Sequence, residues 1–248
     1  SVLPDQSFLT GVNSAYNFID LDGSDQYIDC GDIDTSGNFS FSCWFNADSV
    51  TGSHFLFSMS DQSTSDGMSC GFVSGTSKIY ATANSGSDSS TKITSALSTG
   101  QWYHIAITKS SGQTENIYIN GASDTNSANT SWNLVDETII GSRDAGSNFL
   151  FNGKISQASV FNKILSATEV GAIYTLGRHG NLLDSYSDNL VGNWAMSSLD
   201  SVTGLSDSIS TIYDRSGNSN HGIPQNADAG DLASSPNAEP NGYAKGDT

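Results

Sequence analysis

Basic residues are scarce in this chain: nine Lys and Arg stand against 26 Asp and Glu, which gives the 248 residues a formal net charge of −17. A negative field of this size repels phosphate backbones and anionic lipid headgroups. Nucleic acid and membrane surfaces are therefore not expected as partners.

Long apolar runs are absent as well. No stretch approaches the roughly 20 apolar residues that a membrane-spanning helix needs. The opening "SVLPDQSFLT" has neither the basic start nor the apolar stretch of a signal peptide. We expect neither membrane insertion nor a signal peptide in this chain.

Cysteine is rare, and the three present do not predict a disulfide framework. Cys43 is in phase with Phe41 and Phe45, and Cys30 and Cys70 are likewise in phase with apolar neighbours. The pattern predicts three buried small hydrophobic side chains. The alternative is a Cys43–Cys70 bridge across neighbouring strands, which the sequence alone does not decide.

Short alternating segments are abundant. Apolar and polar residues alternate in "NFSFSCWF", "KIYATA", "WYHIAIT" and "NIYIN", and polar clusters such as "SDQSTSDG" and "NSGSDSS" separate such segments. Many short strands divided by turn signals predict an all-β sandwich or barrel.

One segment, "LSATEVGAIYTLG", predicts a helix. Ser166 and Glu169 have the spacing of a capping box, and Gly177 marks the end. Val170 and Ile173 give the segment an apolar stripe, so we expect a short helix packed on the edge of the sandwich.

The composition changes after this helix, and we predict two regions, 1–178 and 179–248. The second contains strand candidates around Leu190–Met196 and Ile209–Tyr213, followed by a polar tail with three of the four prolines. Such a tail cannot bury enough apolar surface to fold alone. It is expected to be disordered or held against another surface.

Five segments in order resemble laminin-G-like domains of the pentraxin-related, concanavalin A-type kind. They are "FIDLDGSDQYIDCGD", "GNFSFSCWFNAD", "GQWYHIAIT", "ENIYINGASDT" and the stretch from "TIIGS" to "SATEV". The resemblance runs from about Tyr16 to Gly177. It implies a two-sheet antiparallel jelly-roll sandwich with one short helix and an irregular C-terminal extension.

A further family segment is out of its usual place. "VGNWAM … IYDRSGNSNHG" resembles a segment that precedes the first strand in the family, yet here it comes last. Either the C-terminal region returns strands to the same or an adjacent sandwich, or it is a truncated second repeat. We favour the return, because an unpaired strand leaves backbone groups unsatisfied. The loop Asp214–Gly222 is then a structural turn, with a metal ligand or a binding surface as alternatives.

Nothing in the sequence favours catalysis. Gly67–Gly71, "GMSCG", matches the nucleophile-elbow pattern, but that motif needs a strand-to-helix turn and lies here in an alternating strand. The four glutamates lack the paired arrangement of jelly-roll glycosidases, and the four histidines lack metal-ligand spacing. We predict that the protein is not an enzyme and that His104 is a structural strand residue.

Calcium is the cofactor that the resemblance implies, because many family members bind it through loop oxygens. Where the family often carries two acids, this chain has Ser156 and Gln157, which weakens the prediction. Solvated surface carboxylates are the alternative for a chain this acidic. The candidate ligands by residue type are Asp20, Asp22, Asp25 and Asp214, with Asp32 and Asp34 nearby in sequence.

Glycan binding is the second ligand class, since sandwich lectins use exposed aromatic side chains with Asn or Asp hydrogen bonds. Tyr118 and Trp132 are the aromatic candidates, and Asn120 is the polar one. Packing against the sandwich or a neighbour is the alternative for both aromatics.

The sequence thus predicts a non-catalytic module that works outside a cell or on a virion surface. The favoured hypothesis is a structural role, such as a marine bacteriophage decoration or appendage subunit whose partners are neighbouring subunits. The alternative is a lectin-like adhesion module that binds cell-surface glycans, with calcium as a potential requirement. The fold hosts many functions, so this step rests on analogy.

Overall fold

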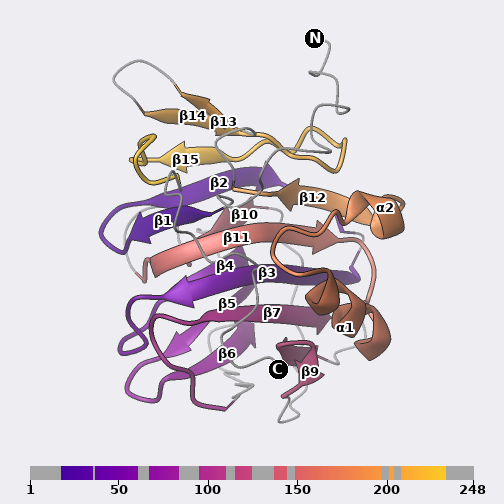
Figure 1. The fold of residues 1–248 in the computed structure, drawn as a ribbon, viewed down its shortest axis with the longest axis horizontal. Helices are drawn as coiled ribbons and strands as arrows, with labels where there is room; N and C mark the ends of the chain where they lie inside the picture. Colours follow the sequence, from indigo (N-terminus) through magenta and orange to yellow (C-terminus); the bar gives the residue numbers. More distant parts are fainter. Residues whose placement is uncertain are drawn as a thin grey trace.

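A computed structural model describes residues 18–35, 37–60, 67–83, 95–109, 115–124, 137–143, 149–196, 201–203 and 208–232. Two antiparallel sheets lie face to face, with a small two-stranded sheet beyond one edge (Figure 1). The predicted all-β sandwich is confirmed. No helix in the described ranges is long and apolar enough to cross a membrane.

The larger sheet has seven strands, and the second has six. The seven-stranded sheet contains, in spatial order, β1 (Ile19–Asp22), β11 (Asn152–Phe161), β3 (Phe39–Ala47), β7 (Trp102–Lys109), β8 (Glu115–Ile119) and β9 (Ala122–Ser123), with β12 (Leu190–Trp194) paired to β11. The six-stranded sheet runs β15 (Ile223–Gln225), β2 (Tyr27–Asp32), β10 (Glu137–Ile140), β4 (Phe55–Ser60), β5 (Gly67–Val73) and β6 (Lys78–Ala83). The two-stranded sheet pairs β13 (Ser201–Thr203) with β14 (Ile209–Ile212).

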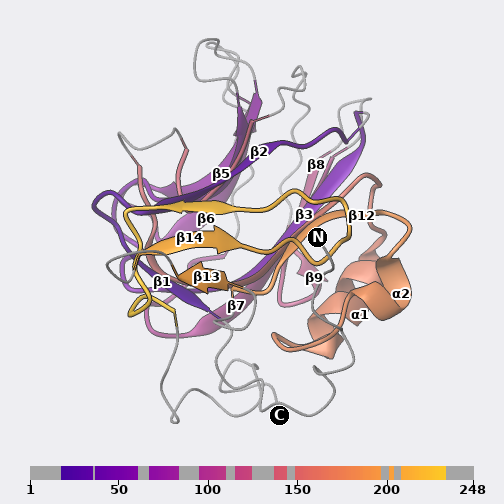
Figure 2. The same cartoon turned by 90° about the horizontal axis from the view of Figure 1, so that it is seen from above.

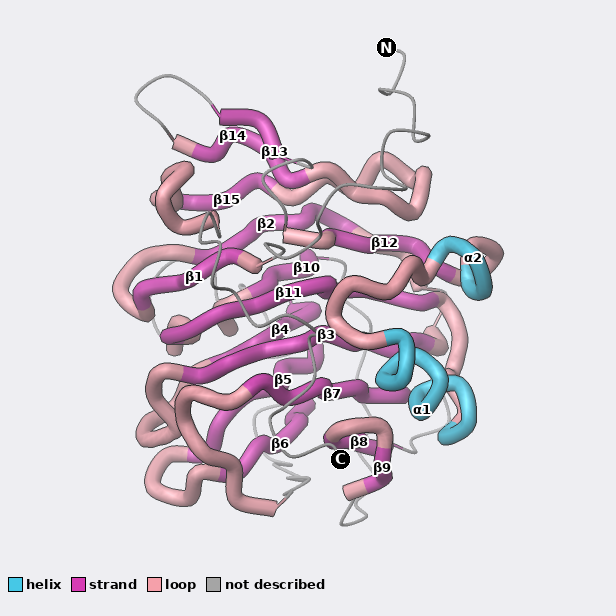
Figure 3. Tube along the Cα trace, in the orientation of Figure 1, coloured by secondary structure: helices cyan, strands magenta, loops and turns pink. Residues whose placement is uncertain are grey.

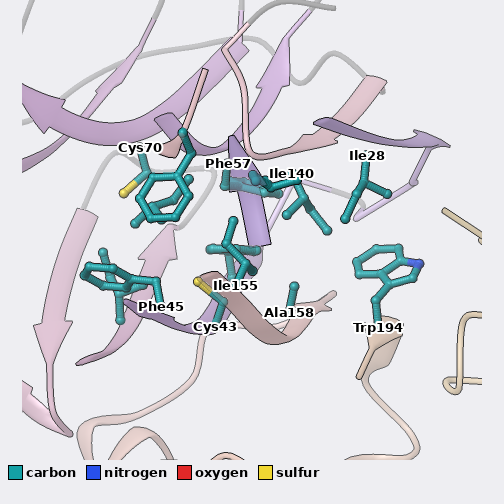
Figure 4. Packing of buried hydrophobic residues seen from close by; sticks show 14 of the residues in the cluster. Ile28, Cys43, Phe45, Phe57, Cys70, Ile140, Ile155, Ala158 and Trp194 are labelled. Carbon is teal, nitrogen blue, oxygen red and sulfur yellow. The ribbon is translucent and has the colours of Figure 1, made fainter. Parts of the chain in front are cut away.

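The core lies between the two large sheets, where the period-2 pattern places the apolar side chains. The Phe41 ring from β3 stacks on the Phe57 ring from β4, with centroids 3.9 Å apart. Cys43 and Cys70 enter this core from β3 and β5 (Figure 4). All three cysteines are buried and free. The alternative of a bridge across neighbouring strands is wrong, because β3 and β5 belong to different sheets.

Helix α1 (Ala167–Leu176) begins at the predicted capping box: the Ser166 hydroxyl and the Glu169 carboxylate each accept a hydrogen bond from the other's backbone N–H. It was expected at an edge, but Val170 and Ile173 pack with Ala106 of the seven-stranded sheet in a second apolar cluster. A short helix, α2 (Leu183–Tyr186), follows. Both helices lie on the side of β3 and β12, away from β5 (Figures 2 and 3).

The C-terminal strands pair with both large sheets of the same chain. β12 pairs with β11, and β15 pairs with β2. Trp194 at the end of β12 is fully buried and lies beside Ile28 of β2 (Figure 4). The C-terminal region therefore closes one edge of the sandwich and belongs to its core.

Candidate functional site

The loop Asp214–Gly222 is built around one buried carboxylate. Asp214, 6% exposed, accepts hydrogen bonds from the backbone N–H groups of Asn193 and Asn220, at 2.9 and 3.1 Å. It also accepts bonds from the N–H and the hydroxyl of Ser216, at 2.8 and 2.7 Å. Protein donors thus occupy its oxygens, and the structural-turn interpretation describes this loop better than a metal ligand does.

The other aspartates predicted as calcium ligands lie near the turn between β1 and β2. Asp20 forms an ion pair with Lys154, 3.0 Å away. An Asp22 oxygen accepts a bond from the Ser24 N–H at 2.8 Å, and Asp25 is exposed. No group of three or more His, Cys, Asp or Glu residues in the described ranges is arranged to hold a metal. The structure therefore does not assemble the predicted calcium ligands.

The two described residues predicted to bind glycan, Tyr118 and Asn120, are both engaged within the fold. Tyr118 is only 7% exposed and lies in the cluster under α1, as its packing alternative expects. The Asn120 side-chain oxygen accepts a bond from the His104 N–H at 2.9 Å, which anchors the hairpin after β8. Trp132 lies outside the described residues.

A different aromatic group lies on the outer face of the six-stranded sheet. Phe55 of β4 and Tyr80 of β6 are both registered against Gly71 of the intervening β5. A Cβ at Gly71 would lie 2.2 Å from the His54 carbonyl oxygen, so only glycine fits there. Phe55 and Tyr80 meet edge to face, with ring centroids 5.5 Å apart. Such pairs are stabilising beyond the area they bury.

Phe149 completes this group and is the exposed member. Its ring lies edge to face against Phe55, with centroids 5.8 Å apart, and the residue is 39% exposed. Its backbone has a φ of 66°, a left-handed conformation that is unfavourable for every residue type except glycine and, to a lesser degree, asparagine and aspartate. Strain of this kind costs roughly 1–3 kcal/mol and is concentrated at functional sites. The strained backbone therefore presents an aromatic ring to solvent.

Three groups hold Phe149 and its neighbour Leu150 in place. The Arg143 guanidinium lies 5.5 Å from the Phe149 ring centroid and 5.9 Å from that of Phe55. The ring nitrogens of His54 lie 2.8 Å from the Leu150 carbonyl oxygen and 2.9 Å from that of Thr51. Phe55 N–H donates to the Phe149 carbonyl at 2.9 Å. We call Phe55, Tyr80, Phe149 and Arg143 the aromatic–arginine cluster.

The next row on this face is polar. Ser58 and Ser69 stand opposite each other, and both hydroxyls are buried with no hydrogen-bond partner in the part of the chain that the structure describes. Burial raises the pKa of the Tyr80 hydroxyl, and the positive charge of Arg143 opposes that rise. The Tyr80 hydroxyl is therefore a neutral hydrogen-bonding group at physiological pH. The cluster combines apolar ring surface, a hydroxyl and a cation.

The sequence patterns do not predict this cluster. One signal was present: Tyr80 alternates with the apolar Ile79 and Ala81 in "KIYATA", so it points away from the core. Arg143 and Phe149 lie after β10 in the sequence, and no periodicity indicates that they meet Phe55, which lies 88 and 94 residues earlier. Only tertiary structure brings these residues together.

Two stacked antiparallel sheets in this strand order define a concanavalin A-like β-sandwich. The chain belongs to the concanavalin A-like lectin/glucanase superfamily, because a laminin G family model of that description matches residues 22–171. The resemblance predicted from the sequence is confirmed. A search of the curated proteins found no sequence match.

Solved structures share the fold. A putative carbohydrate binding protein from Bacteroides ovatus has a TM-score of 0.60 and 16% identity, with 85% of this chain and 58% of that chain covered. A heptameric SAP-like pentraxin from Limulus polyphemus has a TM-score of 0.52 and 16% identity, with 66% and 84% covered. At these identities the likeness shows the fold alone, and the match spans less than two thirds of the Bacteroides protein.

Proposed function

We propose that this chain is a non-catalytic, lectin-like module that binds glycans outside a cell through the aromatic–arginine cluster. The observation that carries this proposal is the strained backbone of Phe149, which holds an aromatic ring partly exposed against Phe55. Sugar rings present apolar C–H faces that stack on aromatic rings, while hydroxyl and guanidinium groups bind their oxygens.

The fold supports a binding role over a catalytic one. The chain shares its architecture with the putative carbohydrate binding protein from Bacteroides ovatus. The site offers one tyrosine hydroxyl and one arginine, and its four members include none of the paired carboxylates on which glycoside hydrolysis depends. Neither the family nor the reported structures support the virion-assembly role favoured by the sequence. We therefore place glycan recognition first.

The test is a glycan array on the purified protein, with calcium and then with chelator, comparing Phe149→Ala with Leu176→Ala. Leu176 is a matched control, because it is an exposed apolar residue (44%) on helix α1. We expect saturable, sugar-competed binding that Phe149→Ala weakens about tenfold or more, which is about 1.4 kcal/mol. Leu176→Ala should bind as the parent protein does. Binding that survives Phe149→Ala, or no binding by the parent protein, would overturn the proposal.

A further inference from the structure

His54 directly precedes β4, and its imidazole lies between two backbone carbonyls. Nδ1 is 2.8 Å from the Leu150 carbonyl oxygen, and Nε2 is 2.9 Å from that of Thr51. A neutral imidazole carries one N–H, so it donates to one of these oxygens while the lone pair of its other nitrogen faces the second. An imidazolium carries two N–H groups and donates to both. The complete set of hydrogen bonds therefore requires the protonated ring.

The backbone around His54 keeps the ring between these carbonyls. Phe72 of β5 donates its N–H to the His54 carbonyl at 2.7 Å, which ties His54 to the sheet. Gly52 has a φ of 109°, and a Cβ at this position would lie 3.0 Å from His54 Nε2. Glycine thus lets the turn that contains Thr51 lie close to the ring. We therefore expect protonation to change the hydrogen bonds of the ring rather than its position.

These hydrogen bonds reach the strained residue of the aromatic–arginine cluster. The carbonyl of Phe149, the residue with a φ of 66°, accepts the Phe55 N–H at 2.9 Å. The next carbonyl, that of Leu150, faces His54 Nδ1. Two successive residues, His54 and Phe55, therefore hold two successive carbonyls of this segment. Hydrogen bonds from a charged donor are roughly twice as strong as neutral ones, so protonated His54 holds the segment more firmly.

We infer that His54 is a positioning residue for Phe149, and that protonation of its ring strengthens glycan binding at the cluster as the pH falls from about 8 to about 5.5. This inference rests on the proposed function. A more firmly held backbone loses less conformational entropy when a sugar binds to the Phe149 ring. A neutral ring lacks one of its two hydrogen bonds, which breaks the connection between the Thr51 turn and the Phe149 segment. The same site then binds more weakly at neutral and alkaline pH.

The other charged groups around His54 are of types that do not titrate in this range. Arg143 lies beside the rings of the cluster, and the Asp48 carboxylate faces Lys154 at 3.8 Å. Burial raises the pKa of the Tyr80 hydroxyl. The acidic residues of the adjoining connections lie outside the described residues and are Asp61, Asp66, Asp88 and Asp144. Carboxylate, guanidinium, ammonium and phenol groups ordinarily keep one charge state between about pH 5 and 8, whereas histidine changes its charge there.

The test is the pH profile of glycan binding by the parent protein and by His54→Gln. Calorimetry with the oligosaccharide that binds most strongly on the glycan array covers about pH 8 to about pH 5.5, and circular dichroism checks the fold at each pH. We expect the parent protein to bind about fivefold more tightly at the acid end. The glutamine amide supplies a donor but gains no proton, so the affinity of His54→Gln should not change with pH.

His221→Gln is the matched control. His221 precedes β15, at the other edge of the same sheet, and its Nδ1 accepts the Asp214 N–H at 3.2 Å. This variant should keep the pH profile of the parent protein. A measurement without glycan follows the ¹³C chemical shift of the Leu150 carbonyl. That shift should change with pH in the parent protein and stay constant in His54→Gln.

The outcomes separate this inference from the proposed function. A parent affinity that is constant with pH, or a pH profile that His54→Gln shares, would overturn the inference, while Phe149-dependent binding would still support the proposed function. Absence of Phe149-dependent binding at every pH would overturn the proposed function. The chemical shift of the Leu150 carbonyl then decides by itself whether His54 holds the Phe149 segment.

Discussion

Phe149 shows how a single residue can be held in an unfavourable state by its surroundings. Its φ of 66° disfavours a side chain, while its ring contact with Phe55 and its backbone bond to the Phe55 N–H hold it there. Arg143 lies over the same ring. Natural sequences keep such strain where a functional group must be presented, at some cost in stability.

This strain predicts an unusual ranking of two substitutions at position 149. Phe149→Gly and Phe149→Ala both remove the ring, but glycine alone accepts a left-handed backbone without steric cost. We expect Phe149→Gly to be more stable than Phe149→Ala by about 1 kcal/mol, although glycine usually destabilises relative to alanine. Urea denaturation of both variants measures the difference. Equal stabilities, or a more stable alanine variant, would show that this backbone is not strained.

At the scale of elements, the C-terminal strands depend on one loop. β12 joins the seven-stranded sheet and β15 joins the six-stranded sheet, so the loop between β14 and β15 must hold both edges in register. Asp214 does this through its bond to the Asn193 N–H in β12. The Trp194 indole N–H donates to the Asn220 carbonyl at 2.8 Å, which fixes the same loop to the core.

Asp214→Ala should therefore destabilise the fold, whereas Asp22→Ala should not. Removing the Asp214 carboxylate leaves the buried Asn193 N–H and the part-buried N–H groups of Ser216 and Asn220 without this acceptor. We therefore expect the free energy of unfolding to fall by about 3 kcal/mol. Asp22 is exposed, and water can replace it as a partner for the Ser24 N–H, so its loss should cost under about 1 kcal/mol. Thermal unfolding compares the stabilities of the two variants. Faster hydrogen exchange at the Asn193 amide in Asp214→Ala would show that the lost hydrogen bond is the cause. Equal effects of the two substitutions would contradict the role given to this loop.

At the scale of the whole molecule, the fold buries two ionisable imidazoles, one wholly and one in part. His104 is wholly buried, with its ring 5.4 Å from that of Trp44 and 5.9 Å from that of Tyr174. Burial lowers the pKa of His104 from 6.5 to about 3. Burial, and then the positive charge of Arg178, lowers the pKa of His179 to about 4. Both imidazoles are therefore neutral in the folded protein at physiological pH.

These lowered pKa values predict acid sensitivity. Below pH 6.5 the unfolded chain binds protons that the folded chain excludes, so stability is complete above pH 6.5 and falls as the pH drops towards 3. Each such group contributes a slope of about 1.4 kcal/mol per pH unit well below 6.5. His104→Gln should flatten the dependence of unfolding free energy on pH between 6.5 and 4, measured by urea denaturation at each pH. If the unfolding free energies of the variant and the parent protein change with pH in parallel, His104 does not contribute to the acid sensitivity.

Local sequence patterns predicted much of the secondary structure of this protein. The capping box at Ser166 and Glu169 and the alternating strands depend on residues close in sequence, so they could be read directly. The position of α1 was less well predicted, because an apolar stripe indicates burial without saying which surface buries it. Tyr118 was taken as a ligand candidate because it is out of phase with the core, yet α1 covers that face. An outward side chain is exposed only where no other element lies over it.

The sequence by itself determined the fold class and the superfamily, because strand periodicity and turn residues act over short distances. The tertiary structure alone decided which outward residues meet. Gly71 lets Phe55 and Tyr80 approach across β5, and a later loop adds Arg143 and Phe149. It also decided that the C-terminal strands close this chain's own sandwich. Such contacts join residues far apart in sequence, and their free energy depends on packing that no local pattern encodes.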